Sequence, residues 1–424
     1  MDKVYKSRRK KRGMNIAYNL LVYFVWFLST YYTIVVMLSL FLKRKEIFEQ
    51  HPPLKQHPLV SIIVPAFNEE ASIAGTIQSL RELNYPNYEV IILNDGSKDK
   101  TSQIVKSKLK GLSNFRFIDN KKNKGKAACL NQGIAVAKGE FFGCMDADSI
   151  VEPDIIKKTI PYFRNSKVGA VTVSVETYKP KGILQRVIDL EYVLGLSLFL
   201  KIFSFHNAVF VTPGPFTMFR SSVANEIGGF DKESITEDFE IAFRIHKAGY
   251  KIRNCIEAKV HTIIPPTFKG IYVQRKRWYT GSLQTIFQHK NMLFRKKYGV
   301  FAFLIPFNYS LIVFGLVLFL YASYLGFSKL FENLLHFRYT DYNLFQRLFD
   351  WHFDILNYGQ VNMLSMTVFL GGILLMIFGL KAAKKSFAKK RFGMLGYPFL
   401  FILYQVFWLG SIIAFLRGRK VKWR

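Results

Sequence analysis

Two aspartates, Asp146 and Asp148, close the apolar run "FFGCMDADS" (141–149). In an extended segment residues i and i+2 point to the same side, so both carboxylates are predicted on one face at the carboxyl end of a buried strand. Open α/β sheets bind ligands at that edge. Paired carboxylates favour a hard cation such as Mg²⁺ or Mn²⁺, and such a cation suits a pyrophosphate. The alternative for an isolated Asp-x-Asp is a solvated turn.

The elements that would position these aspartates alternate between strand and helix from Leu59 onward. Such alternation predicts a parallel, doubly wound α/β sheet. No Gly-x-Gly-x-x-Gly follows the first strand, so the dinucleotide-binding fingerprint is absent. The predicted strands are 59–65, 88–97 and 115–120, and the predicted helices are 69–83, 99–109 and 124–137.

The ends of the chain have a different composition, typical of membrane segments. A basic tail (1–13) precedes residues 14–42, which contain no charge, proline or glycine. A helix of that length reaches about 43 Å, enough for one tilted span. The interrupted apolar stretch 182–206 and the stretch 265–297 suit helices in the membrane interface. We predict a catalytic domain at 59–264 and, within 298–424, three further spans at about 307–327, 357–380 and 394–416.

The charge and cysteine content exclude several classes of protein. The formal net charge is +31 and half of the residues are hydrophobic. Because no nucleic-acid motif is found and the basic clusters flank apolar runs, membrane lipids are the favoured partner and nucleic acid is not expected. The three cysteines form no Cys-x-x-Cys pair, which argues against a zinc cage or a disulfide framework. Basic residues flank both sides of the spans in similar numbers, so charge does not fix the orientation.

Further polar residues follow the first strands of the predicted sheet. Asp95 lies in "NDGSKD" (94–99) after the second strand, where the alternative is an ordinary Asp-Gly turn. Lys126 follows Gly125 at the start of a predicted helix and could place a positive charge near phosphates. Its alternative is a solvated surface lysine.

Two motifs in the second half of the chain carry further candidates. Asp238 lies in "ITEDFE" (235–240), which opens a helix, and the alternative is that Thr236, Glu237 and Asp238 merely cap that helix. In "QRKRW" (274–278), Gln274 and Trp278 are four residues apart and share a helical face, and Arg277 can pair bidentately with phosphate. A basic interfacial helix with a headgroup-level tryptophan is the alternative.

Together these motifs resemble the membrane-embedded processive glycosyltransferases of family 2, which have the GT-A fold. The nearest likeness is to the poly-N-acetylglucosamine, hyaluronan and chitin-oligosaccharide synthases. Five motifs stand in the family's order, of which "VPAFNEE" (64–70), at the end of the first strand, is the first. The segments "NKGKAACLNQG" (123–133) and "TPGPFTMFR" (212–220) add to the likeness. The resemblance implies a Rossmann-like, mostly parallel GT-A domain in the cytoplasm, interfacial helices and about four membrane spans.

The resemblance also assigns roles to residues of this chain. It implies that Asp238 is the catalytic base and that Mg²⁺ or Mn²⁺ is bound by Asp148 with Asp146. One departure is Pro266 in "PPT" (265–267), where family members often carry an acid. A metal-ligand role for the nearby His261 is conceivable, but a buried or solvated histidine is the preferred interpretation. The donor-binding residues would be Pro65, Ala66, Glu69, Asp95, Lys126, Asp146 and Arg277, and the acceptor-binding residues Gln274, Trp278 and Glu237.

The resulting hypothesis is an inverting, processive β-glycosyltransferase of the cell membrane. It would use a UDP-sugar, with UDP-N-acetylglucosamine the best candidate, to extend a polysaccharide. The first alternative is a non-processive lipid glycosyltransferase similar to ceramide glucosyltransferase, whose acceptor is a lipid. The second is a membrane scaffold without catalytic activity, against which the intact set of carboxylates argues.

Overall fold

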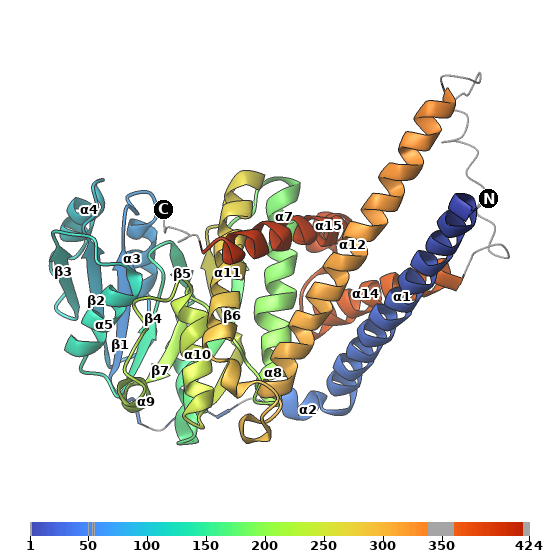
Figure 1. Ribbon diagram of the computed structural model, residues 1–424. Helices are drawn as coiled ribbons and strands as arrows, with labels where there is room; N and C mark the ends of the chain where they lie inside the picture. The colour runs from blue at the N-terminus through green and yellow to red at the C-terminus, as the bar shows by residue number, and fades with distance from the viewer. Residues whose placement is uncertain (1, 50, 53, 55, 338–359, 419–424) are drawn as a thin grey trace. The chain divides into compact units, whose positions relative to one another are not determined.

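The computed structural model describes residues 2–49, 51–52, 54, 56–337 and 360–418 (Figure 1). The chain divides into two compact units. One comprises Met1–Phe41 and Phe307–Phe378, and the other comprises Leu42–Pro306 and Gly379–Arg424. The second unit contains the sheet and all of the candidate site residues.

An eight-stranded sheet forms the centre of this unit, in the order β3-β2-β1-β4-β7-β6-β8-β5. The four strands at one end are parallel, as predicted, but β7 runs antiparallel to both β4 and β6. The sheet is therefore mixed, and β5 also runs antiparallel to its neighbour β8. The strands are β1 (Val60–Ala66), β2 (Tyr88–Asp95), β3 (Phe115–Asn120), β4 (Phe141–Cys144), β5 (Ser149–Val151), β6 (Val168–Thr177), β7 (Thr217–Arg220) and β8 (Lys251–Thr262).

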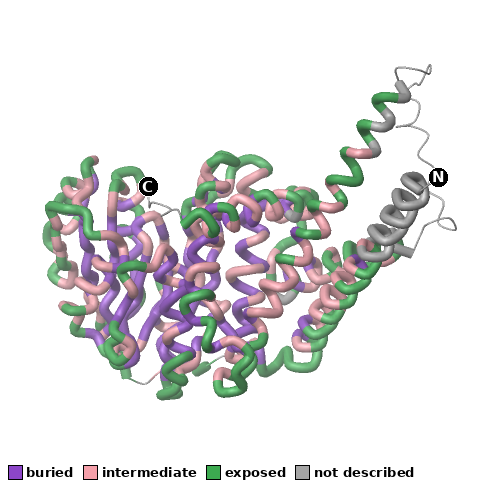
Figure 2. The backbone as a smooth tube through the Cα atoms, viewed as in Figure 1, coloured by how far each residue is buried: buried purple, intermediate pink, exposed green. Residues whose placement is uncertain are grey.

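The first three strands and their helices lie close to their predicted positions. Most residues of β1 and β2 are buried on both faces of the sheet (Figure 2). This explains why their sequences are continuously apolar and do not alternate between apolar and polar residues. Helix α5 (Lys126–Val136) approaches β1 through Gly133, where a Cβ atom would collide with Ile63. Helix α3 (Ile73–Arg81) begins later than predicted because residues 69–72 form a turn. Helix α4 covers Thr101–Lys108.

The stretch predicted to lie in the membrane interface, 182–206, is helical throughout. It comprises α7 (Gly182–Tyr192), a π-helical segment (Val193–Phe199) and α8 (Leu200–Phe205). Two of its charged residues have hydrogen-bond partners inside the protein: the Asp189 carboxylate accepts hydrogen bonds from Thr177, and Lys201 donates to the Tyr162 hydroxyl. Their presence in an apolar stretch is thus explained by internal pairing, and an interfacial position stays a prediction.

Three more helices complete the part of this unit that surrounds the site. They are α10 (Glu237–Lys247), α11 (Phe268–Gln288) and α15 (Phe387–Leu416), and α15 packs on both α7 and α11. Figure 1 shows α15 lying across these two helices. Glycines allow the close approach, because a Cβ atom on Gly393 or Gly396 would collide with α7, and one on Gly410 would collide with Tyr272 of α11.

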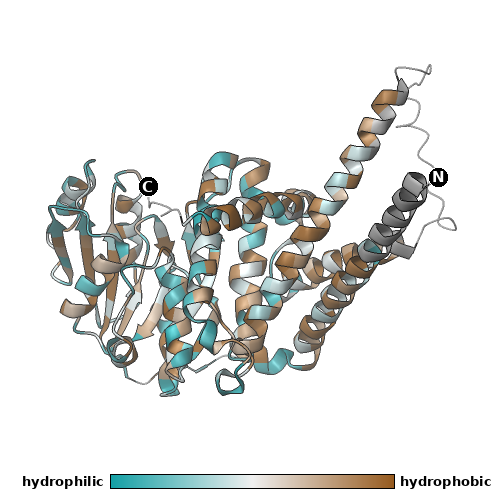
Figure 3. Cartoon of the chain, in the orientation of Figure 1, coloured by the Kyte–Doolittle hydropathy of each residue, from teal (hydrophilic) through white to brown (hydrophobic). Residues whose placement is uncertain are grey.

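The apolar helices are shown by hydropathy in Figure 3. Within the described residues, 18–42 and 301–328 are long and apolar enough to cross a membrane, and the bent pair 387–400 and 402–416 would make a third span. Helix α14 (Gln360–Ala382) has a shorter apolar segment, 366–381, and residues 357–359 of the predicted span lie outside the described residues. Two further boundaries differ from prediction: α1 (Asp2–Leu42) includes the basic tail, and α12 (Phe301–Phe337) continues through Pro306.

Candidate active site

The carboxyl ends of β1, β2 and β4 meet at one edge of the sheet. Register pairs Ala66 of β1 with Asn94 of β2, and Ile63 of β1 with Cys144 of β4. Pro65 and Ala66 are the last two residues of β1 and are buried, so the strand extends one residue beyond its predicted end. Glu69 lies in the turn that follows, where its carboxylate accepts a hydrogen bond from Ser72 at 2.6 Å.

The carboxylate of Asp95 is buried at the end of β2 and holds the start of α5. Its two oxygens accept hydrogen bonds from the backbone N–H groups of Lys124 and Gly125, at 2.7 and 3.0 Å. Gly96 has a φ of 70°, and a Cβ atom there would lie 2.7 Å from the backbone of Asn123, so glycine is required. Asp95 thus positions the first residue of α5, and a contact with nucleotide remains a prediction.

That first residue, Lys126, points into a cluster of carboxylates. Its Nζ atom lies 2.6 Å from Asp146 Oδ1 and 2.8 Å from Glu237 Oε1, and the side chain is 14% exposed. Burial alone would lower the pKa of Lys126, but the neighbouring charges of Asp146, Glu237 and Asp238 raise it well above the usual value. The alternative of a solvated surface lysine is therefore wrong.

Asp146 and Asp148 lie beyond the strand, not within it. Strand β4 ends at Cys144, and the two aspartates lie in the bend and turn that lead into β5. The shared-face geometry predicted for an extended strand does not apply. Asp148 nevertheless lies near Asp146 and Glu69, because its burial and the charges of these two carboxylates together raise its pKa to about 7.

The surroundings of Asp148 fit a bound cation. Its Oδ1 atom has only long contacts with the hydroxyl groups of Ser149 and Thr262, at 3.3 and 3.4 Å. A partly buried carboxylate beside two other acids and with weak hydrogen bonds is stabilised by a positive ion. Within the described part of the chain, no three His, Cys, Asp or Glu side chains converge to hold a metal ion by themselves. The donor set therefore suits an ion that also takes ligands from phosphate and water, as Mg²⁺ commonly does.

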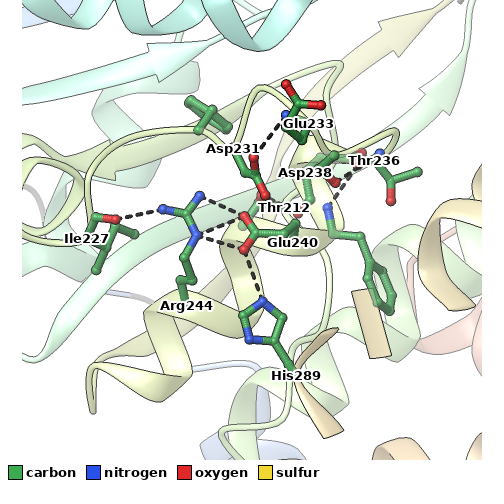
Figure 4. A network of polar contacts seen from close by, with 12 residues as sticks. Thr212, Ile227, Asp231, Glu233, Thr236, Asp238, Glu240, Arg244 and His289 are labelled. Atoms are coloured by element: carbon green, nitrogen blue, oxygen red, sulfur yellow. Dashed lines mark hydrogen bonds and ion pairs between the residues drawn. The ribbon is translucent and has the colours of Figure 1, made fainter. Parts of the chain in front are cut away.

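Asp238 lies at the start of α10 on the other side of Lys126. Its backbone carbonyl accepts hydrogen bonds from the N–H and hydroxyl groups of Thr212, at 3.0 and 2.8 Å (Figure 4). Burial raises the pKa of its side chain to about 7; Glu237 adds to the rise, and Lys126 and Arg277 oppose it. Thr236 precedes the helix but makes no capping hydrogen bond with its side chain. The capping alternative therefore does not account for this motif through Thr236.

The loop that contains Thr212 contacts both Asp238 and Asp146. Gly214, two residues on, accepts a hydrogen bond from the backbone N–H of Asp146. A Cβ atom on Gly214 would lie 2.6 Å from Asp146 Oδ2 and 2.9 Å from Lys126 Nζ, so only glycine fits beside this ion pair. A small pocket opens here, lined by Lys126, Asp146, Thr212, Gly214, Glu237 and Asp238 among others.

Helix α11 brings the "QRKRW" motif to the same region. It packs closely on the start of α10, since a Cβ atom on Gly281 would lie 2.5 Å from Thr236. The Oε1 atom of Gln274 is buried without a hydrogen-bond partner. Arg277 is close enough to lower the pKa of Asp238. Trp278 is partly buried: its ring stacks on Tyr192.

Comparison of the sequence with those of known proteins agrees with this arrangement of residues. Residues 61–228 match the model of the family described as "Glycosyl transferase family 2". The poly-beta-1,6-N-acetyl-D-glucosamine synthase of Staphylococcus epidermidis is 29% identical over 331 residues, which cover 77% of this chain and 79% of that protein. The enzyme of the same name from Staphylococcus aureus is 30% identical over 273 residues, 63% of this chain and 66% of that protein. The chain is a family 2 glycosyltransferase.

A solved structure supports the fold of this glycosyltransferase. The mannosyltransferase PcManGT from Pyrobaculum calidifontis, in complex with GDP-Man and Mn²⁺, is similar with a TM-score of 0.54 and 15% identity. The similarity covers 94% of this chain and all of that one. At this identity the likeness concerns the fold alone, and the GT-A fold class predicted from the sequence is confirmed.

Some polar residues of the glycosyltransferase were not predicted. Glu240 is buried and is held by the Arg244 guanidinium and by His289 Nε2 at 3.1 Å, which ties α10 to the end of α11 (Figure 4). The spacing of Glu240 and Arg244, four residues apart on one helix, was a usable signal. Arg275, only 1% exposed, pairs with Glu191 of α7 at 2.7 Å. No local sequence pattern predicts that ion pair, because its two residues are far apart in the sequence.

Proposed function

We propose that this glycosyltransferase is an inverting, processive enzyme that extends a β-linked polysaccharide from UDP-N-acetylglucosamine at the membrane. The observation that carries this proposal is the position of Asp238, whose carboxylate shares a pocket with the Lys126–Asp146 ion pair. A candidate base and a group of charges suited to bind a diphosphate thus line the same pocket. The names of the staphylococcal relatives support the choice of sugar.

Asp238 is proposed to accept the proton of the acceptor hydroxyl as its oxygen attacks the anomeric carbon. The bond from that carbon to the diphosphate breaks on the opposite face, so the configuration inverts. A pKa of about 7 leaves Asp238 able both to hold and to release a proton near neutral pH, which suits a general base. Lys126 remains protonated because of its carboxylate neighbours, and it is proposed to face the leaving phosphates together with Arg277.

Asp148 and Asp146 are the residues proposed to hold Mg²⁺ or Mn²⁺. When bound, such an ion neutralises charge that develops on the diphosphate leaving group. The weak hydrogen bonds of Asp148 and its closeness to Asp146 and Glu69 support this role. Pro65, Ala66 and Asp95 border the same edge of the sheet and are proposed to flank the nucleotide. Asp95 would act there chiefly by fixing the loop at residues 124–125.

Gln274, Trp278 and Glu237 are proposed to bind the acceptor. Gln274 supports this, because its Oε1 atom is buried and unpaired in a region where a sugar hydroxyl would satisfy it. The apolar helices are compatible with a membrane protein. We place the catalytic domain on the cytoplasmic side, where nucleotide-activated sugars are found, and the polymer would leave through the membrane region.

The test is the size of the product made from radiolabelled donor by washed membranes that contain the full chain. UDP-N-acetylglucosamine, UDP-glucose and UDP-glucuronate are compared, and membranes with the Asp238→Asn variant give the background. A ladder or high polymer from UDP-N-acetylglucosamine is expected. A single lipid-linked sugar would instead favour the non-processive lipid glycosyltransferase, and polymer from another donor alone would overturn the choice of sugar.

A further inference from the structure

A second pocket lies away from the active site, where α7 and α15 begin. Its volume is about 360 Å³, which is enough for a small polar group. Four of its lining residues are basic, and only one is acidic. The residues that matter are Arg186 and Asp189 of α7 and Lys389, Lys390, Arg391 and Phe392 of α15.

The charges of this pocket are not balanced. Lys390 is paired with Asp189, whose other oxygen accepts hydrogen bonds from Thr177. Arg186, Lys389 and Arg391 have no carboxylate partner within the described residues. The pocket therefore holds a net positive charge that the protein itself does not compensate.

Two of these basic side chains, Arg186 and Arg391, contact the ring of Phe392. The guanidinium carbons of Arg186 and Arg391 lie 5.1 and 4.9 Å from the centroid of its ring. Cation–π attraction holds each guanidinium in place, while the two positive charges repel each other. A bound anion would relieve that repulsion, and planar guanidinium groups are well suited to phosphate oxygens.

Exposed apolar side chains begin one turn away from the pocket on both helices. Ile183 on α7 is 66% exposed, and Leu395 and Phe399 on α15 are 73% and 68% exposed. The two helices are in contact here, because a Cβ atom on Gly396 would lie against Val187 and 3.8 Å from Ile183. A free phosphate ion makes no use of such a surface, whereas the acyl chains of a phospholipid do.

We propose that this pocket, which we call the headgroup pocket, binds the phosphate of an anionic phospholipid whose acyl chains lie along the exposed faces of α7 and α15. The inference is independent of the sugar and of the processivity proposed above. Because α15 also packs on α11, the bound lipid would hold the helix that carries Trp278 against the rest of the catalytic unit.

The test uses the purified full chain in a neutral detergent. Its thermal unfolding midpoint is measured during titration with short-chain phosphatidylglycerol, phosphatidylcholine or inorganic phosphate. Phosphatidylglycerol is expected to raise the midpoint in a saturable way that weakens with salt. The triple variant Arg186→Gln/Lys389→Gln/Arg391→Gln should lower its affinity on the order of a hundredfold, given the usual worth of each basic residue near anionic lipid.

The matched control is Lys108→Gln/Lys110→Gln/Lys247→Gln, which removes three exposed charges away from the headgroup pocket and should bind phosphatidylglycerol as the unmodified chain does. The single variant Arg391→Gln covers the case in which the triple variant fails to fold, and should bind several-fold more weakly. Equal binding of phosphatidylglycerol by pocket and control variants would overturn the proposal. An equal effect of inorganic phosphate or of phosphatidylcholine would overturn the choice of ligand.

Discussion

The Nζ atom of Lys126 lies 2.8 Å from the Oε1 atom of Glu237. This pair joins α5, from the parallel half of the sheet, to the start of α10, which follows the antiparallel strand β7. Because Lys126 also contacts Asp146, a carboxylate predicted to bind the donor and a carboxylate predicted to bind the acceptor share one cation. Removing Asp146 or Glu237 is therefore expected to lower the pKa of Lys126.

The first prediction concerns the base. Asp238→Asn is expected to reduce sugar transfer by about 10²- to 10⁴-fold, since the amide keeps the shape but accepts no proton. UDP binding should change little, and calorimetric titration of the purified variant measures it. Asp231→Asn, in the loop before α10, is the matched control and should retain normal turnover. A variant at Asp238 with more than about a tenth of normal turnover would contradict the role.

The second prediction concerns pH. Because Asp238 must be deprotonated to act, kcat/KM should rise with pH around its pKa of about 7. Lys126 lowers this pKa and Glu237 raises it, so Lys126→Gln should move the rise to higher pH and Glu237→Gln should move it to lower pH. Initial rates between pH 5.5 and 9 measure the shift. A midpoint that neither substitution moves would rule out Asp238 as the titrating group.

The same shift predicts how stability depends on pH. Folding raises the pKa of Asp238 from 3.8 to about 7, so between these values the folded state holds a proton that the unfolded state has lost. Stability from this group is therefore present at low pH and is lost as pH rises through 7. Asp238→Asn should raise the unfolding midpoint relative to the unmodified chain at pH 8 but not at pH 4. An unchanged difference at both values would contradict the assigned pKa.

Strands β1 and β2 were predictable from the sequence because they are buried apolar runs bounded by turn residues. The site was predictable only in part. Lys126, Asp146 and Asp238 could be singled out by type and local position. The ion pairs of Lys126 with Asp146 and Glu237, however, depend on long-range packing that includes the close fit of Gly214, which no local pattern encodes. The burial of Arg275 against Glu191 was missed for the same reason, since it depends on how α7 and α11 pack.

The third prediction concerns the metal. Asp148→Ala is expected to abolish transfer together with Mn²⁺-dependent binding of UDP, because it removes a partly buried carboxylate whose hydrogen bonds from Ser149 and Thr262 are long. Calorimetric titration of UDP with and without Mn²⁺ gives a readout that does not depend on turnover. Glu152→Ala, which removes a partly exposed acid that pairs with Lys158, is the control. Full activity of the unmodified enzyme in excess EDTA would exclude a required divalent ion.

The last prediction concerns Trp278 and the growing chain. The Arg275 guanidinium lies 4.3 Å from the centroid of the Trp278 ring, and Tyr192 stacks on it at 6.4 Å, so the ring is held in one orientation. A fixed aromatic ring can contact the apolar face of a sugar with little loss of side-chain entropy. It also binds without selecting one pattern of hydroxyl groups, which would let the polymer advance after each addition. We therefore expect Trp278→Ala to stop elongation, while hydrolysis of the donor to free UDP continues at a reduced rate.

The measurement combines UDP release and product length on the same purified variant. Trp278→Phe is the control, because it keeps an aromatic ring for the sugar and for the Arg275 contact, and it should still make polymer. If Trp278 served only to anchor α11 or to cover Arg275, the alanine variant would make polymer of normal length in lower yield. Polymer of normal length would thus exclude an acceptor-binding role for Trp278. Short products with continued UDP release would support that role, because binding of the acceptor would then have been lost while donor cleavage remained.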